Sequence, residues 1–281
     1  MEKINLNYNN LDFQEILSFI KNSSLGKQII SELNLTDKEV IDHYELINNY
    51  IKINKRCETC KSMSNCDHST KGHRYGLKRD IDNQLTDYFT ICNIYKDYYQ
   101  KKKNLLYTTF NEEDLLDESQ KNFILDNVNI LGMDFVKKII SIQKGIKVNG
   151  AYLQVANSKI RLKLVKSLAY ALLANHNVSI VKFSDLLKVI KSEFKITGNN
   201  TYQTIIDSEI LILDGLGNEA ITTWSRDEIL LSILDNRLQS DKITILCSEF
   251  SLDDLKKLYK VNYNDEVKVN QIIEKINEIK K

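Results

Sequence analysis

Three of the five cysteines stand close together in the chain, as Cys57-Glu-Thr-Cys60 followed by Cys66, and His68 and His73 come shortly after them. Two thiolates separated by two residues can bind one tetrahedral Zn²⁺, because a tight turn brings both sulfurs to about 2.3 Å from the metal. A third cysteine and one histidine complete a closed site with no coordination position left for water. The spacing therefore predicts a structural zinc ion held by Cys57, Cys60, Cys66 and a histidine.

Two histidines compete for the fourth position. His73 follows Gly72, which can turn the imidazole back toward the cysteines, whereas His68 is only one residue removed from Cys66 and would need a strained turn. We expect His73 to be the ligand, with His68 as the alternative. A redox Cys-x-x-Cys pair belongs at a strand–helix junction, which is not indicated here.

The remaining cysteines and the basic residues near the cluster have simpler interpretations. Cys92 and Cys247 lie within apolar runs and are expected to be small buried hydrophobic residues. The flanking basic residues favour a solvated rim around the zinc module over a phosphate-binding surface; they are Lys55, Arg56, Lys71, Arg74, Lys78 and Arg79.

A second candidate for chemistry is Asp214, which ends the apolar run EILILD at residues 209–214. In a nucleotide-binding sheet, an acid at the carboxyl end of such a strand holds Mg²⁺ directly or through water. The alternative is an aspartate that forms the turn after the strand.

The elements that must position these residues suggest two domains, given a length of 281 residues. Lys+Arg (39) and Asp+Glu (38) nearly cancel, so no global basic charge points to nucleic acid. No apolar stretch approaches the roughly 18–20 residues that span a bilayer, and the amino terminus lacks the basic-then-apolar order of a signal peptide. We therefore expect a cytoplasmic protein with no membrane partner.

Hydrophobic periodicity predicts two or three helices over residues 11–53, a strand over 87–100 and a polar linker beginning at 107. From about residue 138 strands alternate with helices; the strands are expected at 151–155, 178–183, 209–214 and 243–248, the helices at 160–174, 186–194 and near 229–238, and two further helices at the carboxyl end. Such alternation predicts an α/β fold with a parallel sheet covered on both faces. The predicted organisation is an amino-terminal domain at 1–106, a linker and leading helix at 107–137, and the α/β domain at 138–281.

Several stretches resemble one protein family. The strand ending at Asp214 is followed by Gly217-Asn-Glu219 and by Trp224-Ser-Arg226-Asp227, which is similar to the Asp-Ile-Gly-Ala-Glu turn and the Trp-x-Arg-Asp helix of bacterial primosomal helicase loaders of the DnaI/DnaC type. KGIKVNGAYLQV at 144–155 resembles the first strand of these loaders. The cysteine cluster and LLDESQKN at 115–122 fall where they carry a zinc module and a linker.

The resemblance implies a AAA+/RecA-like domain preceded by a small, mainly helical zinc-binding domain. It further implies that the zinc-bearing domain contacts a replicative DnaB-type helicase. The AAA+-like domain is then expected to contact single-stranded DNA and neighbouring loader subunits, which are copies of this chain or an intact paralogous loader.

The ATPase motifs of the family are degraded in this chain. Where loaders carry the phosphate loop Gly-x-x-Gly-x-Gly-Lys-Thr, residues 155–160 read VANSKI, which keeps Lys159 but places Ile160 at the position of the Mg²⁺-binding threonine. Four further positions depart from the family; Gly215 replaces an acid, Glu249 a polar sensor, and Gln271 and Lys275 two arginines. The sequence therefore predicts no catalytic residues, and ATP is a doubtful cofactor whose candidate contacts are Lys159 and Asp214.

Two other functions stay open at this point. One is an ATPase with a phosphate loop rebuilt around Ser158 and Lys159. The other is a zinc-stabilised protein that binds nucleic acid or another replication factor.

Overall fold

The structure is a computed structural model that describes residues 13–193, 201–262 and 265–281, and the chain forms two compact units, Met1–Lys96 and Asp97–Lys281. The division falls earlier than the expected boundary after residue 106. The stretch expected to be a linker supplies a strand, β3 (Leu105–Thr108), and the short helix α6 (Glu112–Leu116) to the second unit. Leu115 and Leu116 are buried in the core of that unit.

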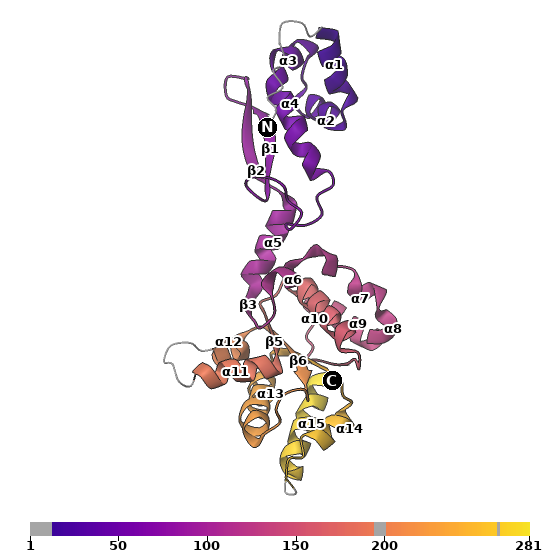
Figure 1. Cartoon of the computed structure of the whole chain (residues 1–281), viewed down its shortest axis with the longest axis vertical. Helices are drawn as coiled ribbons and strands as arrows, with labels where there is room; N and C mark the ends of the chain where they lie inside the picture. The colour runs from indigo at the N-terminus through magenta and orange to yellow at the C-terminus, as the bar shows by residue number, and fades with distance from the viewer. Residues whose placement is uncertain (1–12, 194–200, 263–264) are drawn as a thin grey trace. The chain divides into compact units, whose positions relative to one another are not determined.

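The first unit begins with four helices where two or three were expected. They are α1 (Phe13–Asn22), α2 (Ser24–Leu33), α3 (Asp37–Asp42) and α4 (Tyr44–Asn54), and Figure 1 shows them gathered beside a two-stranded hairpin. Short polar caps separate them: Ser23 caps α2, and Thr36 forms a capping box with Glu39 at the start of α3. Their apolar faces form one core, to which Ile20, Val40 and Ile47 contribute without any exposure.

The hairpin pairs β1 (His73–Arg79) with β2 (Leu85–Ile91) in antiparallel register. The strand predicted over 87–100 is therefore correct only for its first part, because α5 (Asn93–Asn104) begins two residues after β2 ends. The last turn of α5 carries Lys101, Lys102 and Lys103, which suit the negative end of the helix dipole.

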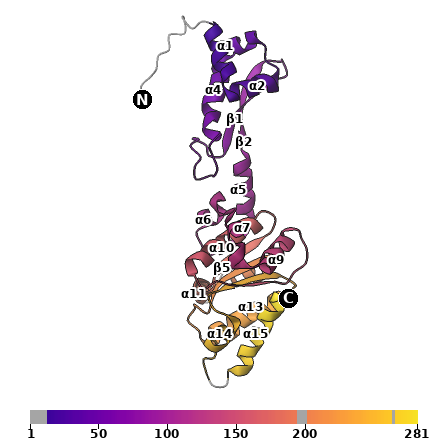
Figure 2. The same cartoon turned by 90° about the vertical axis from the view of Figure 1, so that its right-hand side faces the viewer.

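The second unit is built on a five-stranded sheet that is parallel throughout, in the order β3-β5-β6-β7-β4. Figure 2 shows this sheet, in which β5 is labelled, with helices on both of its faces. The other strands are β4 (Gly150–Gln154), β5 (Val178–Lys182), β6 (Ile210–Leu216) and β7 (Ile243–Ser248). The larger helices are α9 (Met133–Gln143), α10 (Ser158–Leu172), α11 (Phe183–Glu193), α12 (Thr201–Asp207), the π-helix η4 (Trp224–Leu230) that continues into α13 (Leu231–Gln239), α14 (Leu252–Leu258) and α15 (Glu266–Lys280). The expected α/β fold with a parallel sheet flanked by helices is confirmed.

Alternate residues of the central strand β6 serve the two faces of the sheet. Ile210 and Ile212 join one core with helices α9 and α10, whereas Leu211 and Leu213 join another with α11, α13 and α15. Because both faces are covered, the strand is apolar without alternation from Ile210 to Leu213.

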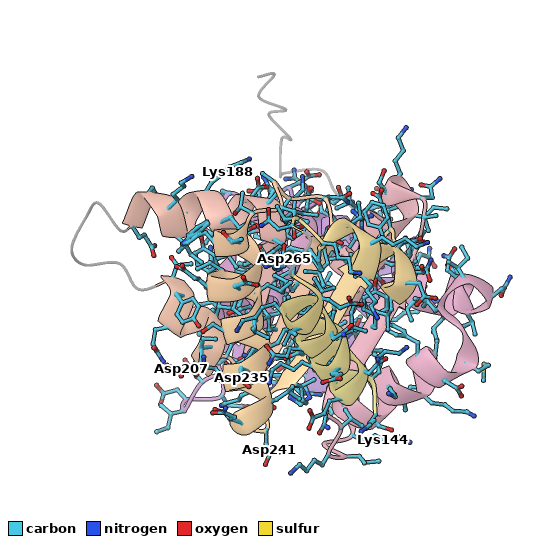
Figure 3. The ribbon with its side chains drawn as sticks, turned by 90° about the horizontal axis from the view of Figure 1, so that it is seen from below. Lys144, Lys188, Asp207, Asp235, Asp241 and Asp265 are labelled. Atoms are coloured by element: carbon cyan, nitrogen blue, oxygen red, sulfur yellow. The ribbon has the colours of Figure 1, made fainter. Side chains whose placement is uncertain are left out.

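Ion pairs fasten the carboxyl-terminal helices to the sheet unit. The buried Arg226 of η4 donates to Asp265, just before α15, over 2.6 Å and to Asp227 over 2.7 Å. Lys275 of α15 pairs with Asp235 of α13, and Figure 3 labels both Asp235 and Asp265. Within the described ranges, no helix has the length and apolar character needed to cross a membrane.

Candidate functional site

The first candidate site lies at the carboxyl edge of the parallel sheet, where ligands bind in open α/β folds. β7 lies between β4 and β6, so the segments that follow these three strands meet at the same edge. Asp214, near the end of β6, is fully buried there. Burial raises the pKa of the Asp214 carboxyl, since a charge at this depth has lost its water.

The counter-ion of Asp214 is Arg161, a residue of the first turn of α10 that is only 3% exposed. Its Nε donates to Oδ1 of Asp214 over 2.7 Å and its Nη1 donates to Oε1 of Glu249 over 2.6 Å. Burial opposes the charge of Arg161, but the hydrogen bonds to the two carboxylates outweigh it and raise the pKa of the guanidinium. One internal cation therefore joins Asp214, the candidate Mg²⁺ ligand, to Glu249, which replaces the polar sensor of the loaders.

The segment at the phosphate-loop position is closed by its own hydrogen bonds. Asn157 caps α10, because its side-chain oxygen accepts the backbone N–H of Ile160 over 3.1 Å. Free N–H groups at a helix start are what an anion needs, and here the cap occupies one of them. Lys159 is exposed and takes part in none of the ion pairs found among the described residues.

The other positions that the resemblance to the loaders singled out are engaged elsewhere or exposed. Glu219 is buried, and its Oε2 accepts the N–H of Gly217 over 2.8 Å within the turn after β6. Gly215 lies within β6, at the irregularity in register between Asp214 and Leu216, with a φ of 79° that suits glycine. Lys275 pairs with Asp235, and Gln271 is exposed on α15. Of the two sequence candidates, the structure engages Asp214 with Arg161 and leaves Lys159 at the surface.

Arg161 is the residue that sequence reasoning missed, although a signal was present. It stands in register with Leu164, Leu168 and Leu172, the buried stripe of α10. A charged residue in such a stripe requires a buried partner. Glu249, read as a loss at the sensor position, was the other half of that signal.

The second candidate site is a cavity in the first unit. It is lined by Cys57, Cys60, Cys66, His68, Gly72, His73, Arg74, Cys92, Asn93 and Ile94. The cavity thus gathers the three clustered cysteines, both candidate histidines and, unexpectedly, Cys92. Cys92 follows β2 directly, so the hairpin carries it back to the cluster; an apolar sequence context gave no sign of this.

Several contacts in the cavity involve the potential ligand atoms. Sγ of Cys57 lies 3.0 Å from Nε2 of His68. The backbone N–H of Gly72 donates to Sγ of Cys66 over 3.4 Å, and that of Tyr95 donates to Sγ of Cys92 over 3.3 Å.

His73 also lines the cavity but makes other contacts. Its Nδ1 lies 3.2 Å from the carbonyl oxygen of Lys71, and its ring centroid is 6.2 Å from that of Tyr95. In the described part of the chain, no three His, Cys, Asp or Glu side chains are arranged as a metal site. The donor types nevertheless fit zinc, since thiolate and imidazole are its preferred ligands.

The fold and the sheet edge together define an α/β protein with a five-stranded parallel sheet flanked by helices, whose carboxyl edge holds the ion pairs of Arg161. No family model matches the sequence. The chain is 24% identical over 286 residues to the replicative helicase loader DnaI of Bacillus subtilis (strain 168), across 94% of this chain and 90% of that protein.

Two solved structures also match this chain at low similarity. A crystal structure of DnaI matches with a TM-score of 0.47 and 21% identity, over 64% of this chain and 93% of that one. The crystal structure of the DnaC helicase loader matches with a TM-score of 0.44 and 20% identity, over 56% of this chain and 95% of that one. The near full-length sequence similarity confirms the resemblance to helicase loaders of the DnaI/DnaC type.

Proposed function

We propose that this chain is a replicative helicase loader that acts in the initiation of DNA replication as a binding and docking factor. The observation that carries this proposal is the extent of the similarity to DnaI, which covers 94% of this chain and therefore both of its units. A protein that shared only a nucleotide-binding fold would match over the second unit alone.

The partners follow from this role. The first unit binds a replicative helicase of the DnaB type. The second, AAA+-like unit contacts single-stranded DNA and neighbouring loader subunits, either copies of this chain or an intact paralogue. The location is the cytoplasm, where a bacterial primosome assembles.

Nucleotide does not drive this loader. In a working site Mg²⁺ bridges the strand-end acid and the phosphates. Here the guanidinium of Arg161 already binds Asp214 and Glu249, and the Asn157 cap takes one of the N–H groups at the helix start. The sheet edge is a degenerate phosphate-binding site that serves as a rigid docking body, and these same contacts oppose an ATPase rebuilt around Ser158 and Lys159.

A structural zinc ion holds the first unit together. Cys57 and Cys60 supply two ligands, and two of the four remaining donors in the cavity complete the site; those donors are Cys66, His68, His73 and Cys92. This choice is supported by the 3.0 Å approach of Cys57 to His68 and by the backbone N–H groups that donate to Cys66 and Cys92. Zinc in a closed site of this kind supplies folding free energy rather than catalysis.

The experiment is co-purification of the full-length, zinc-loaded chain with the replicative helicase of the same organism. We expect a stable complex without nucleotide, and an equal yield from Lys159→Ala, because Lys159 is exposed and lacks an ion-pair partner among the described residues. Cys57→Ser/Cys60→Ser is expected to abolish the complex. Absence of binding by the zinc-loaded chain would contradict the loader role, and a strict need for ATP would contradict the docking mechanism.

A further inference from the structure

One face of the hairpin in the first unit combines an aromatic ring with two cations. In paired strands alternate residues share a face. The register brings together three pairs on this face, Arg74 with Thr90, Gly76 with Tyr88, and Lys78 with Thr86. Tyr75, Leu77 and Leu85, which join the core of the unit, belong to the opposite face.

Tyr88 lies directly over Gly76. A Cβ atom added at Gly76 would stand 2.6 Å from two ring carbons of Tyr88, so the position accepts only glycine without a shift of the ring. The ring is nevertheless 40% exposed, and Nζ of Lys78 lies 5.7 Å from its centroid. Gly76 thus allows the Tyr88 ring to pack against the strand, while the outer surface of the ring remains exposed to solvent next to Lys78.

The cations on this face are also open. Arg74 and Lys78 are exposed, and neither forms an ion pair within the described residues. Arg79, the next basic residue of the strand, differs, because it pairs with Glu39 over 2.8 Å. Arg74 and Lys78 stand four residues apart, about 13 Å along a strand, with Gly76 and its tyrosine midway between them.

A ring flanked by two cations is suited to single-stranded nucleic acid, where unpaired bases stack on aromatic side chains while basic residues contact the phosphates. A duplex offers phosphates but no free base face, and an acidic protein surface offers charge but no stacking partner. We propose that this face binds single-stranded DNA, with Tyr88 stacking on a base and with Arg74 and Lys78 contacting the phosphates on either side.

The site is separate from the contact with DNA proposed for the second unit. The choice of DNA over RNA rests on the proposed role in replication. The inference that the face binds a single strand rests on its side chains alone and does not depend on that role. Helicase binding and DNA binding are therefore measured separately, so that failure of one does not decide the other.

The test is fluorescence anisotropy of a labelled oligothymidylate with the full-length, zinc-loaded chain over a range of salt concentrations. Loss of stacking in Tyr88→Leu is expected to weaken binding roughly five- to a hundredfold, while Tyr88→Phe keeps it. Arg74→Gln/Lys78→Gln is expected to reduce the slope of log K against log salt by about 1.4, or about 0.7 for each phosphate contact. Lys27→Gln/Lys38→Gln, which removes two exposed lysines from α2 and α3, is the matched control and is expected to change neither.

Four results would overturn the proposal. They are no saturable binding, equal binding by the hairpin variants and the control, a preference for duplex over single strand, and a preference for the matching oligouridylate. Loss of helicase binding in Tyr88→Leu with unchanged DNA affinity would instead assign the face to the helicase. Circular dichroism and zinc content are used to check that each variant is folded. If Tyr88→Leu is not folded, Tyr88→Phe serves as the folded reference.

Discussion

The two units treat their charged and metal-binding side chains in opposite ways. At the sheet edge of the second unit, Arg161 binds Oδ1 of Asp214 and Oε1 of Glu249 over 2.6–2.7 Å, whereas the buried Oδ2 of Asp214 has no hydrogen-bond partner among the described residues. In the first unit the cavity holds several thiols and two imidazoles, and the hairpin face holds two cations without ion-pair partners among the described residues. The potential ligand-binding side chains of the first unit are therefore less engaged with one another than the charged residues at the sheet edge of the second.

The difference has a physical origin in burial. Asp214 stands at the end of a strand covered on both faces, so it cannot lose its cation without a cost of several kcal/mol. An arginine from the adjacent helix supplies that cation permanently. The fold thus keeps the acid while the site loses its metal.

The largest expected effect concerns zinc. Replacing Cys57 and Cys60 by serine, or removing the metal with a chelator, is expected to unfold the first unit, because structural zinc contributes on the order of 10 kcal/mol to a small module. The second unit, with its own two cores, is expected to keep its thermal transition. Metal analysis and calorimetry check both statements.

Single variants then assign the ligands. Each of four residues is replaced in turn: Cys66, His68, His73 and Cys92. Two of these four variants are expected to lose about one zinc per chain, and the other two are expected to retain it. An unchanged zinc content in Cys57→Ser/Cys60→Ser would remove the zinc proposal.

The next effect is at Arg161. Arg161→Met leaves Asp214 buried without its cation and is expected to destabilise the second unit by about 3–5 kcal/mol, whereas Arg161→Met/Asp214→Asn recovers much of the loss. Lys166→Met on the same helix is the matched control, since its pair with Asp114 is partly exposed and is expected to contribute about 0.2–1 kcal/mol. Denaturant unfolding measures all three, and equal losses for Arg161→Met and Lys166→Met would show that the buried pair carries no special weight.

Much of the second unit could be predicted from sequence, because its signals are local. Strands expected at 178–183 and 243–248 are observed as Val178–Lys182 and Ile243–Ser248, since continuous apolar runs between helices have few other interpretations. β3 was missed, because four residues next to a polar stretch give little periodicity.

The first unit was harder to predict. β1 reads HRYGLKR, where charged residues and a glycine hide the alternation, and only its pairing with β2 makes it a strand. Aromatic residues of α5 suggested a strand, yet the segment is a helix, whose second half is rich in the helix formers Gln and Lys. Contacts between distant segments place Cys92 in the cavity and Arg161 at the sheet edge. Patterns in the sequence alone do not encode such contacts.

A smaller effect is expected at the start of α10. Asn157→Ala removes the cap that accepts the Ile160 N–H, at a cost of about 1 kcal/mol, whereas Asn157→Asp keeps an acceptor and is expected to keep the stability. Urea unfolding of the full chain gives both values. A stabilised Asn157→Ala would mean that the segment is strained for another purpose, such as holding a phosphate.

The smallest expected effect is that of nucleotide. A ligand that binds the folded state stabilises it by about 0.4 kcal/mol when its concentration equals its Kd and by about 2.7 kcal/mol at a hundred times its Kd. Millimolar Mg²⁺-ATP is therefore expected to leave the unfolding midpoint of the second unit unchanged, because Arg161 and the Asn157 cap already occupy the places of metal and phosphate. A shift of the unfolding midpoint in the unmodified chain would contradict the proposal that Arg161 takes the place of the metal ion. A shift that arises only in Arg161→Met would show that this arginine is what excludes Mg²⁺, and would locate the difference between the two units in a single side chain.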